Sequence, residues 1–125
     1  MLRIISLNLN GIRSAVSKGF LDWLAQQDAD LICLQELKAR SADLSPAMRS
    51  PTGLQGWFHH AEKKGYSGVG ILTKIQPDLV KAGMGIPEYD FEGRFIRADY
   101  GDLSIVSVYH PSGTTGEERQ AFKMI

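Results

Sequence analysis

The sequence predicts an α/β protein whose sheet is mixed and largely antiparallel. Short apolar runs recur along the 125 residues, a stretch with helical spacing separates the first two runs, and turn residues separate the later ones. Hydrophobic residues make up 43% of the chain, enough to bury a core, and the length suits one ordinary domain. No repeat or linker divides the chain, so we treat residues 1–125 as part of a single domain.

The first elements are expected to form a strand–helix–strand unit. Residues 2–9 are almost wholly apolar and predict a strand, after which Gly11 allows a tight exit. Residues 20–25 carry apolar side chains at helical spacing, with Ser17 as a candidate N-cap. The apolar run over residues 31–34 predicts a buried strand. This order is that of a βαβ unit, although the spacing does not define the direction of pairing.

The second half of the chain predicts more strands than helices. A short helix is expected within residues 43–49 and a turn at 50–53. Residues 57–61 and 69–73 predict two strands joined by a loop, and residues 83–87 predict another loop. Residues 94–100 and 103–109 are expected to pair as a hairpin across Gly101 and Asp102. A helix begins at residue 117 and meets no stop signal by residue 125, so we expect a chain truncated at its C-terminus.

Charge and cysteine content limit the classes of partner and the cellular compartments that we expect. The 14 basic and 14 acidic side chains cancel, so bulk charge points to no class of partner. The single Cys33 excludes a disulfide framework, favours a reducing compartment and is expected to be a buried, inert thiol. Arg3 interrupts any signal peptide, and no apolar stretch approaches the roughly 20 residues that span a bilayer. We expect a cytoplasmic protein without a membrane partner.

Polar side chains gather where the first two predicted strands end. Asn8 and Asn10 would share one face of the first strand, and Glu36 follows the second. If these strands are adjacent, one edge of the sheet collects a carboxylate and amide oxygens, which suit Mg²⁺ or Mn²⁺ and not zinc. Protein-bound Mg²⁺ commonly also contacts substrate phosphates, so the set hints at phosphate-ester chemistry. The alternative is two capping asparagines and a solvated glutamate.

Tyr109 ends another predicted strand. Its phenol can donate a hydrogen bond to a phosphate oxygen, or act as a base if a nearby cation lowers its pKa from about 10. The alternative is a tyrosine that serves only packing.

The loop over residues 62–68 combines cations, an aromatic ring and small residues. Lys63 and Tyr66 lie in it, and basic loops of this kind bind phosphates without reading base sequence. Arg13, Lys38 and Arg94 are candidates to extend this phosphate-binding surface. The alternative is an ordinary solvated turn.

The sequence does not match several other catalytic or ligand-binding motifs. Val69 occupies the last glycine position of a nucleophile elbow, and no dinucleotide or phosphate-loop fingerprint is present. His59 and His60 are neighbours in a predicted strand and would face opposite sides, so they cannot share one metal ion. We expect these two residues and His110 to be structural or surface residues.

Five stretches spread over the whole chain stand out together. They are ISLNLNGIR at 5–13, LICLQELK at 31–38, GYSGVGIL at 65–72, EGRFI at 92–96 and VYHPSG at 108–113. In this order, the five stretches resemble the motifs of the exodeoxyribonuclease III family of apurinic/apyrimidinic endonucleases.

The resemblance implies the N-terminal half of a four-layer α/β sandwich of the DNase I-like type. It also implies Mg²⁺-dependent hydrolysis of double-stranded DNA, 5′ to abasic sites or from 3′ ends, by a monomer when complete. Glu36 would be the metal carboxylate, Asn8 would bind metal or orient water, and Asn10 stands where some relatives carry aspartate. Tyr109 would contact the scissile phosphate. The family's DNA-facing edge would carry Arg13, Lys38, Lys63, Tyr66 and Arg94.

The resemblance also implies a second half carrying G-D-x-N and S-D-H motifs, and neither motif occurs in the 125 residues. We therefore expect this chain alone to be inactive or nearly so, because hydrolysis needs a group that generates and orients the nucleophile. Two alternatives stay open. One is another phosphoesterase of the same superfamily, a DNase I-like nuclease or an inositol-polyphosphate phosphatase. The other is a non-catalytic module that binds DNA or phosphate.

Overall fold

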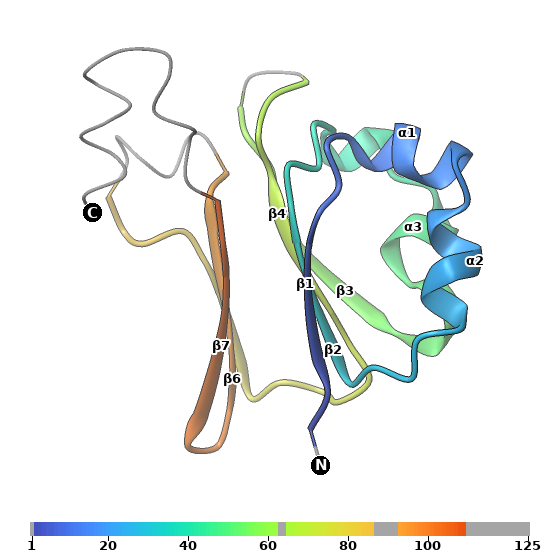
Figure 1. The fold of residues 1–125 in the computed structure, drawn as a ribbon. Helices are drawn as coiled ribbons and strands as arrows, with labels where there is room; N and C mark the ends of the chain where they lie inside the picture. The colour runs from blue at the N-terminus through green and yellow to red at the C-terminus, as the bar shows by residue number, and fades with distance from the viewer. Residues whose placement is uncertain (1, 63–64, 87–92, 110–125) are drawn as a thin grey trace.

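The computed structural model describes residues 2–62, 65–86 and 93–109 (Figure 1). The strands are β1 (Ile4–Asn8), β2 (Leu31–Gln35), β3 (Gln55–His59), β4 (Val69–Thr73), β5 (Leu79–Ala82), β6 (Phe95–Tyr100) and β7 (Leu103–Val108). The helices are α1 (Ile12–Ser17), α2 (Phe20–Ala25) and α3 (Pro46–Arg49), with 3₁₀ turns at Ser41–Asp43 and Pro51–Gly53.

The strands form two sheets. One has the order β1-β2-β4-β3 and the other the order β5-β6-β7. β1 and β2 pair in parallel, and every other pair is antiparallel. The predicted α/β class with mixed, largely antiparallel pairing is therefore confirmed, and the strands divide between two sheets that face each other.

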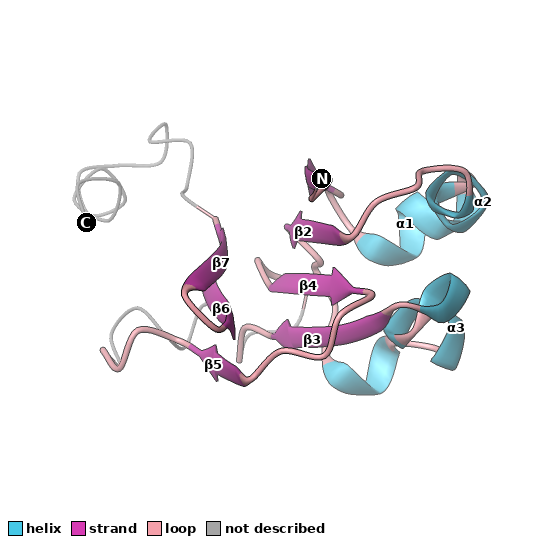
Figure 2. Ribbon diagram, turned by 90° about the horizontal axis from the view of Figure 1, so that it is seen from below, coloured by secondary structure: helices cyan, strands magenta, loops and turns pink. Residues whose placement is uncertain are grey.

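The larger sheet lies between the helices and the smaller sheet (Figures 1 and 2). Side chains on β2 alternate between the two cores. Ile32 and Leu34 face the helices, whereas Leu31 and Cys33 face the second sheet, and all four are at most 4% exposed. Burial on both faces explains why this strand reads as an uninterrupted apolar run.

Most of the predicted strands are confirmed. β4 has the predicted bounds, and β3 starts two residues earlier than expected and ends at His59. The predicted hairpin is present, with Tyr100 opposite Leu103 across a turn in which Gly101 has φ 61°. The sequence did not predict β5, because its four residues offer only two consecutive apolar side chains before Lys81.

The helices differ from the prediction in two places. Ser17 is not the N-cap of the second helix. Residues 12–17 form their own helix, whose last hydroxyl donates to the carbonyl of Ser14 at 2.7 Å. Gly19, with φ 99°, precedes α2 instead, because the sharp turn between α1 and α2 needs a left-handed backbone. The predicted helix at 43–49 is shorter, and α3 starts at Pro46 after an N-cap, Ser45.

The helix expected over residues 117–125 lies outside the described residues, as does residue 87 of the predicted loop. In the described ranges, no helix combines the length and apolar character that crossing a membrane requires.

Candidate metal and phosphate site

β1 and β2 end side by side, and the segments beyond them stay joined. The parallel register sets Asn8 opposite Gln35. Three backbone hydrogen bonds of 2.8–2.9 Å then continue the pairing: Leu9 N–H to the Gln35 carbonyl, Gly11 N–H to that of Glu36 and Ile12 N–H to that of Leu37. The strands are therefore adjacent, as the metal-site hypothesis required, and Asn8, Asn10 and Glu36 lie at one end of the sheet.

Glu36 follows β2 in a constrained backbone position. Its φ is 52°, uncommon for a residue with a side chain, and its carbonyl is held by the Gly11 N–H. The residue is half-buried. Its carboxylate makes no hydrogen bond or ion pair with another residue of the described ranges, so both oxygens are available to a cation.

The two asparagines play different parts. Asn8 is exposed, and its Oδ1 accepts the backbone N–H of Asn10 at 2.9 Å. Asn10 has left the strand with φ 48°, so the prediction that alternation places both side chains on one strand face is wrong. The Oδ1 of Asn10 accepts a hydrogen bond from Lys38 Nζ at 2.7 Å. That ammonium would repel a metal ion at the same oxygen.

Two of the candidate phosphate-binding cations lie beside this edge. Lys38 is half-buried at φ 51°, and Arg13 is exposed on α1. Arg13 Nη2 donates to the Lys38 carbonyl at 3.2 Å. Both cations are therefore connected to the segment that carries Glu36.

The loop before β4 contacts that segment directly. The Lys38 N–H donates to the Ser67 carbonyl at 2.7 Å, and the Leu37 N–H to that of Gly68 at 3.0 Å. Tyr66 is half-buried, and Lys63 lies outside the described residues. Ser67 is 6% exposed, and its hydroxyl has no partner in the described part of the chain.

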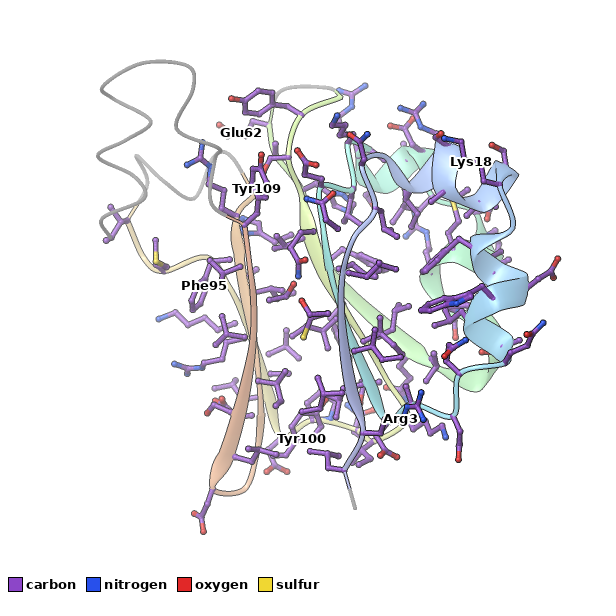
Figure 3. The ribbon with its side chains drawn as sticks, viewed as in Figure 1. Arg3, Lys18, Glu62, Phe95, Tyr100 and Tyr109 are labelled. Atoms are coloured by element: carbon purple, nitrogen blue, oxygen red, sulfur yellow. The ribbon has the colours of Figure 1, made fainter. Side chains whose placement is uncertain are left out.

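Tyr109 follows β7, and its N–H donates to the Arg94 carbonyl at 2.9 Å. Figure 3 places Tyr109 at the same end of the sheets as Glu62, and its ring packs against the core between them. Arg94 is 6% exposed, so the expectation that it extends a basic surface is wrong. Two neighbouring segments lie against the backbone around Arg94. The Gly68 N–H donates to the carbonyl of Gly93, and the Tyr109 N–H donates to the carbonyl of Arg94 itself.

Sequence reasoning missed a polar link between the two sheets. Gln35 Nε2 donates to Ser107 Oγ at 3.1 Å and to Ser6 Oγ at 3.3 Å. Ser107 is 1% exposed and donates to the Leu34 carbonyl at 2.8 Å. These bonds fix the second sheet against the residue just before Glu36. The only signal in the sequence was a glutamine that ends an apolar run.

The remaining candidate ligands are occupied structurally. Nδ1 of His59 lies 2.9 Å from the Phe95 carbonyl and Nδ1 of His60 lies 2.7 Å from that of Ala39, which confirms structural roles for both, while His110 lies outside the described residues. Cys33 is buried, and this burial raises the pKa of its thiol. Across the described ranges, no three His, Cys, Asp or Glu residues cluster as a metal site.

Comparison with known proteins gives consistent matches along the chain. The Endonuclease/Exonuclease/phosphatase family matches residues 5–123. The chain is 36% identical over 124 residues to a DNA-(apurinic or apyrimidinic site) endonuclease of Dictyostelium discoideum, covering 98% of this chain and 34% of that protein. It is equally identical, over 124 residues, to an exodeoxyribonuclease of Bacillus subtilis (strain 168), covering 98% of this chain and 48% of that protein.

A solved structure gives the same result. An AP endonuclease from Archaeoglobus fulgidus superposes with a TM-score of 0.81 at 28% identity, covering 99% of this chain and 48% of that one. The chain thus spans only 34% to 48% of the length of these relatives.

Proposed function

Since the chain belongs to the Endonuclease/Exonuclease/phosphatase family, we propose that it is the N-terminal part of a DNA repair nuclease. The likeness to the Archaeoglobus fulgidus enzyme confirms the expected fold, half of a DNase I-like α/β sandwich. The substrate would be double-stranded DNA, incised 5′ to abasic sites or shortened from 3′ ends. The Dictyostelium relative, an endonuclease of apurinic or apyrimidinic sites, and the Bacillus relative, an exodeoxyribonuclease, support these two activities.

The observation that carries this proposal is that Asn8 and Glu36 both lie at the joined ends of β1 and β2. Glu36 and Asn8 would hold a divalent cation, Mg²⁺ first and Mn²⁺ as the alternative, because carboxylate and amide oxygens are hard ligands. The carboxylate of Glu36, which makes no hydrogen bond or ion pair within the described ranges, supports this assignment. Asn10 would assist less directly, because Lys38 occupies its oxygen. When bound, such a cation supplies Lewis-acid stabilisation of charge on a phosphate oxygen.

The chain's own residues would position the phosphodiester. The Tyr109 phenol would donate to a non-bridging phosphate oxygen, and the hydrogen bond from its N–H to the Arg94 carbonyl keeps the ring at the sheet ends. Lys38 and Arg13 would attract the DNA backbone without reading bases. Tyr66 contributes an aromatic surface, and Lys63 stays a candidate from the sequence alone. Arg94, being buried, would act from beneath Tyr109.

A cytoplasmic location and a monomeric complete protein are part of the same proposal. The buried Cys33, with its raised pKa, supports a thiol that never enters a disulfide.

The test is a chimera in which residues 1–125 replace the matching part of the Bacillus subtilis relative. We expect it to incise a duplex bearing one abasic site, with Mg²⁺ present. Tyr109→Phe should lower kcat/KM by about 10²-fold or more, as for other general acid–base groups. Glu36→Gln should cost more than the ~10–100-fold typical of residues that only support a metal ligand. Glu62→Gln, an exposed glutamate at the same end of the sheets, is the matched control and should change little.

Two results would contradict the proposal. One is incision that survives Glu36→Gln. The other is a chimera that hydrolyses inositol polyphosphates and leaves abasic DNA intact, which would favour a phosphatase of the same superfamily.

A further inference from the structure

The two residues given the central roles in the proposed site belong to different sheets. Glu36 directly follows β2 of the larger sheet, whereas Tyr109 directly follows β7 of the smaller one. A phosphate that both residues serve needs a fixed spacing between them, because a displacement of about 1 Å can cost about 10²-fold in rate. The position of one sheet against the other is therefore part of the proposed site.

The core between the sheets does not fix that spacing by itself. Apolar attraction is non-directional, so it opposes separation of the sheets more than sliding. The buried cluster there consists of Leu31, Cys33, Val69, Ile71, Ile96 and Ala98. The Nδ1 of His59, 2.9 Å from the Phe95 carbonyl, anchors β6, but Tyr109 follows β7, one strand further across the sheet.

Gln35 supplies a directional contact to β7. Its Nε2 donates to Ser107 Oγ at 3.1 Å, and that hydroxyl donates to the Leu34 carbonyl at 2.8 Å. Because a hydroxyl has one proton and Ser107 gives it to Leu34, the Ser107 oxygen can only accept from the Gln35 amide. Ser107 is 1% exposed, so the oxygen has no water to replace a lost donor. The contact therefore fixes both the distance and the direction between the two strands.

This contact lies close to both functional residues along the chain. Gln35 immediately precedes Glu36, and Ser107 stands two residues before Tyr109. Residues two apart share a strand face and lie about 7 Å from each other. The Tyr109 N–H still pairs with the Arg94 carbonyl, so the strand geometry continues up to Tyr109. The contact between Gln35 and Ser107 thus joins the backbones of the two functional residues by a short path.

A comparable link joins the sheets at their other end. The Tyr100 hydroxyl donates to Thr73 Oγ1 at 2.9 Å, and Thr73 is 0% exposed. Thr73 pairs with Leu31, the first residue of β2, whereas Gln35 is the last. Figure 3 shows Tyr100 and Tyr109 at opposite ends of the sheets. The Tyr100 link can therefore be removed far from the proposed site, which makes it a matched control.

We propose that Gln35 is a positioning residue, which acts through Ser107 to set the spacing between the Glu36 carboxylate and the Tyr109 phenol. Gln35 does not itself contact the phosphate. This inference rests on the proposed nuclease function and adds a residue to it. The contact is absent from the basic edge that would attract DNA, so its loss slows the chemical step and leaves DNA binding in place.

The first test measures incision of an abasic duplex by the chimera described above. Gln35→Met keeps the length of the side chain and removes its N–H donors. We expect kcat and kcat/KM to fall equally, by about 10-fold or more, because only the transition-state geometry is lost. Tyr100→Phe also removes one inter-sheet hydrogen bond. Both variants should lower the unfolding temperature, but Tyr100→Phe should keep the kcat of the parent chimera.

A double-mutant cycle distinguishes positioning from general stability. In a Tyr109→Phe background, Gln35→Met should cost no further rate, because the phenol that the contact positions is already gone. Ser107→Ala removes the acceptor of the same hydrogen bond and should reproduce the fall in kcat. It is also the second variant if Gln35→Met does not fold, as judged by circular dichroism.

Three results would overturn the positioning role: an unchanged kcat in folded Gln35→Met or Ser107→Ala, an equal fall in Tyr100→Phe, or the same Gln35→Met loss with and without the Tyr109 phenol. Failure of the nuclease proposal looks different. There the parent chimera does not incise the duplex, or Tyr109→Phe leaves its rate unchanged, and the positioning role falls with it.

Discussion

Backbone hydrogen bonds hold single residues in place at the sheet ends. Glu36 receives the Gly11 N–H on its carbonyl, and Tyr109 reaches Arg94 through its own N–H. Side-chain changes at these positions therefore leave the backbone contacts in place. This makes Glu36→Gln and Tyr109→Phe sound probes of chemistry, because folding and function are separable there.

His60 offers a residue-scale prediction about pH. The pKa of His60 lies below the usual value of about 6.5, because burial disfavours the charged ring. The hydrogen bond to the Ala39 carbonyl acts in the opposite direction and is the smaller effect. As pH falls below about 6.5 the unfolded chain takes up a proton at this ring, whereas the folded chain stays neutral until its lower pKa is reached. The folded state therefore loses stability across that window. Urea midpoints measured as a function of pH should fall more steeply for the wild type than for His60→Gln. Parallel curves would contradict this assignment.

At the residue scale, the sequence predicted where site residues lie along the chain better than it predicted their backbone conformation or burial. The abrupt end of an apolar run located Glu36, since a buried strand must turn polar where it leaves the sheet. The hydrogen bond that Asn10 accepts from Lys38 was not predictable, because the two residues lie 28 positions apart in the chain. Nor was the burial of Arg94, which depends on segments that meet it only in the folded molecule.

Among the elements, α2 depends most on the core. A six-residue helix is far below the ~12–15 residues at which isolated helices become stable in water. Its Leu24 is 3% exposed within the core between the helices and the larger sheet. Leu24→Ala should lower the free energy of unfolding by about 2–5 kcal/mol. Gln26→Ala, exposed at the end of the same helix, should stay within about 0.5 kcal/mol of the wild type. Equal urea midpoints for the two variants would contradict this account.

Element prediction succeeded where hydrophobic periodicity was strong and failed where local geometry decided. β4 and the β6–β7 hairpin were predictable from apolar runs and a glycine turn. The division between α1 and α2 was not, because Ser17 belongs to a residue type favoured at helix starts, and only the turn through Gly19 in the folded chain shows that Ser17 ends α1 instead. β5 has too few residues to show a period.

At the scale of the whole molecule, we predict that the 125-residue chain alone gives no incision of abasic duplex above background with Mg²⁺ present. It spans 34% to 48% of the curated relatives compared above and carries neither G-D-x-N nor S-D-H. The chimera with the Bacillus subtilis relative is the positive control. Incision by the purified chain that Glu36→Ala abolishes would contradict the prediction, whereas incision insensitive to that change would indicate a contaminant.

The two-sheet arrangement lay beyond sequence reasoning for a physical reason. Alternation along a strand tells which side chains share a face, but not which sheet a strand joins. The link from Gln35 to Ser107 spans 72 residues, and no local pattern encodes it.

The strand order β1-β2-β4-β3 also determines how long β2 waits for its second neighbouring strand during synthesis. β2 is apolar on both faces, but its second neighbour, β4, is complete only when the ribosome has added the 38 residues from Gln35 to Thr73. At about 5–20 residues per second, that interval is about 2–8 s. During this time the nascent chain presents an apolar strand with one edge unpaired, the kind of segment that chaperones bind. Codons that slow translation between β2 and β4 should therefore lower the soluble yield, and the same codons placed after β4 should have less effect.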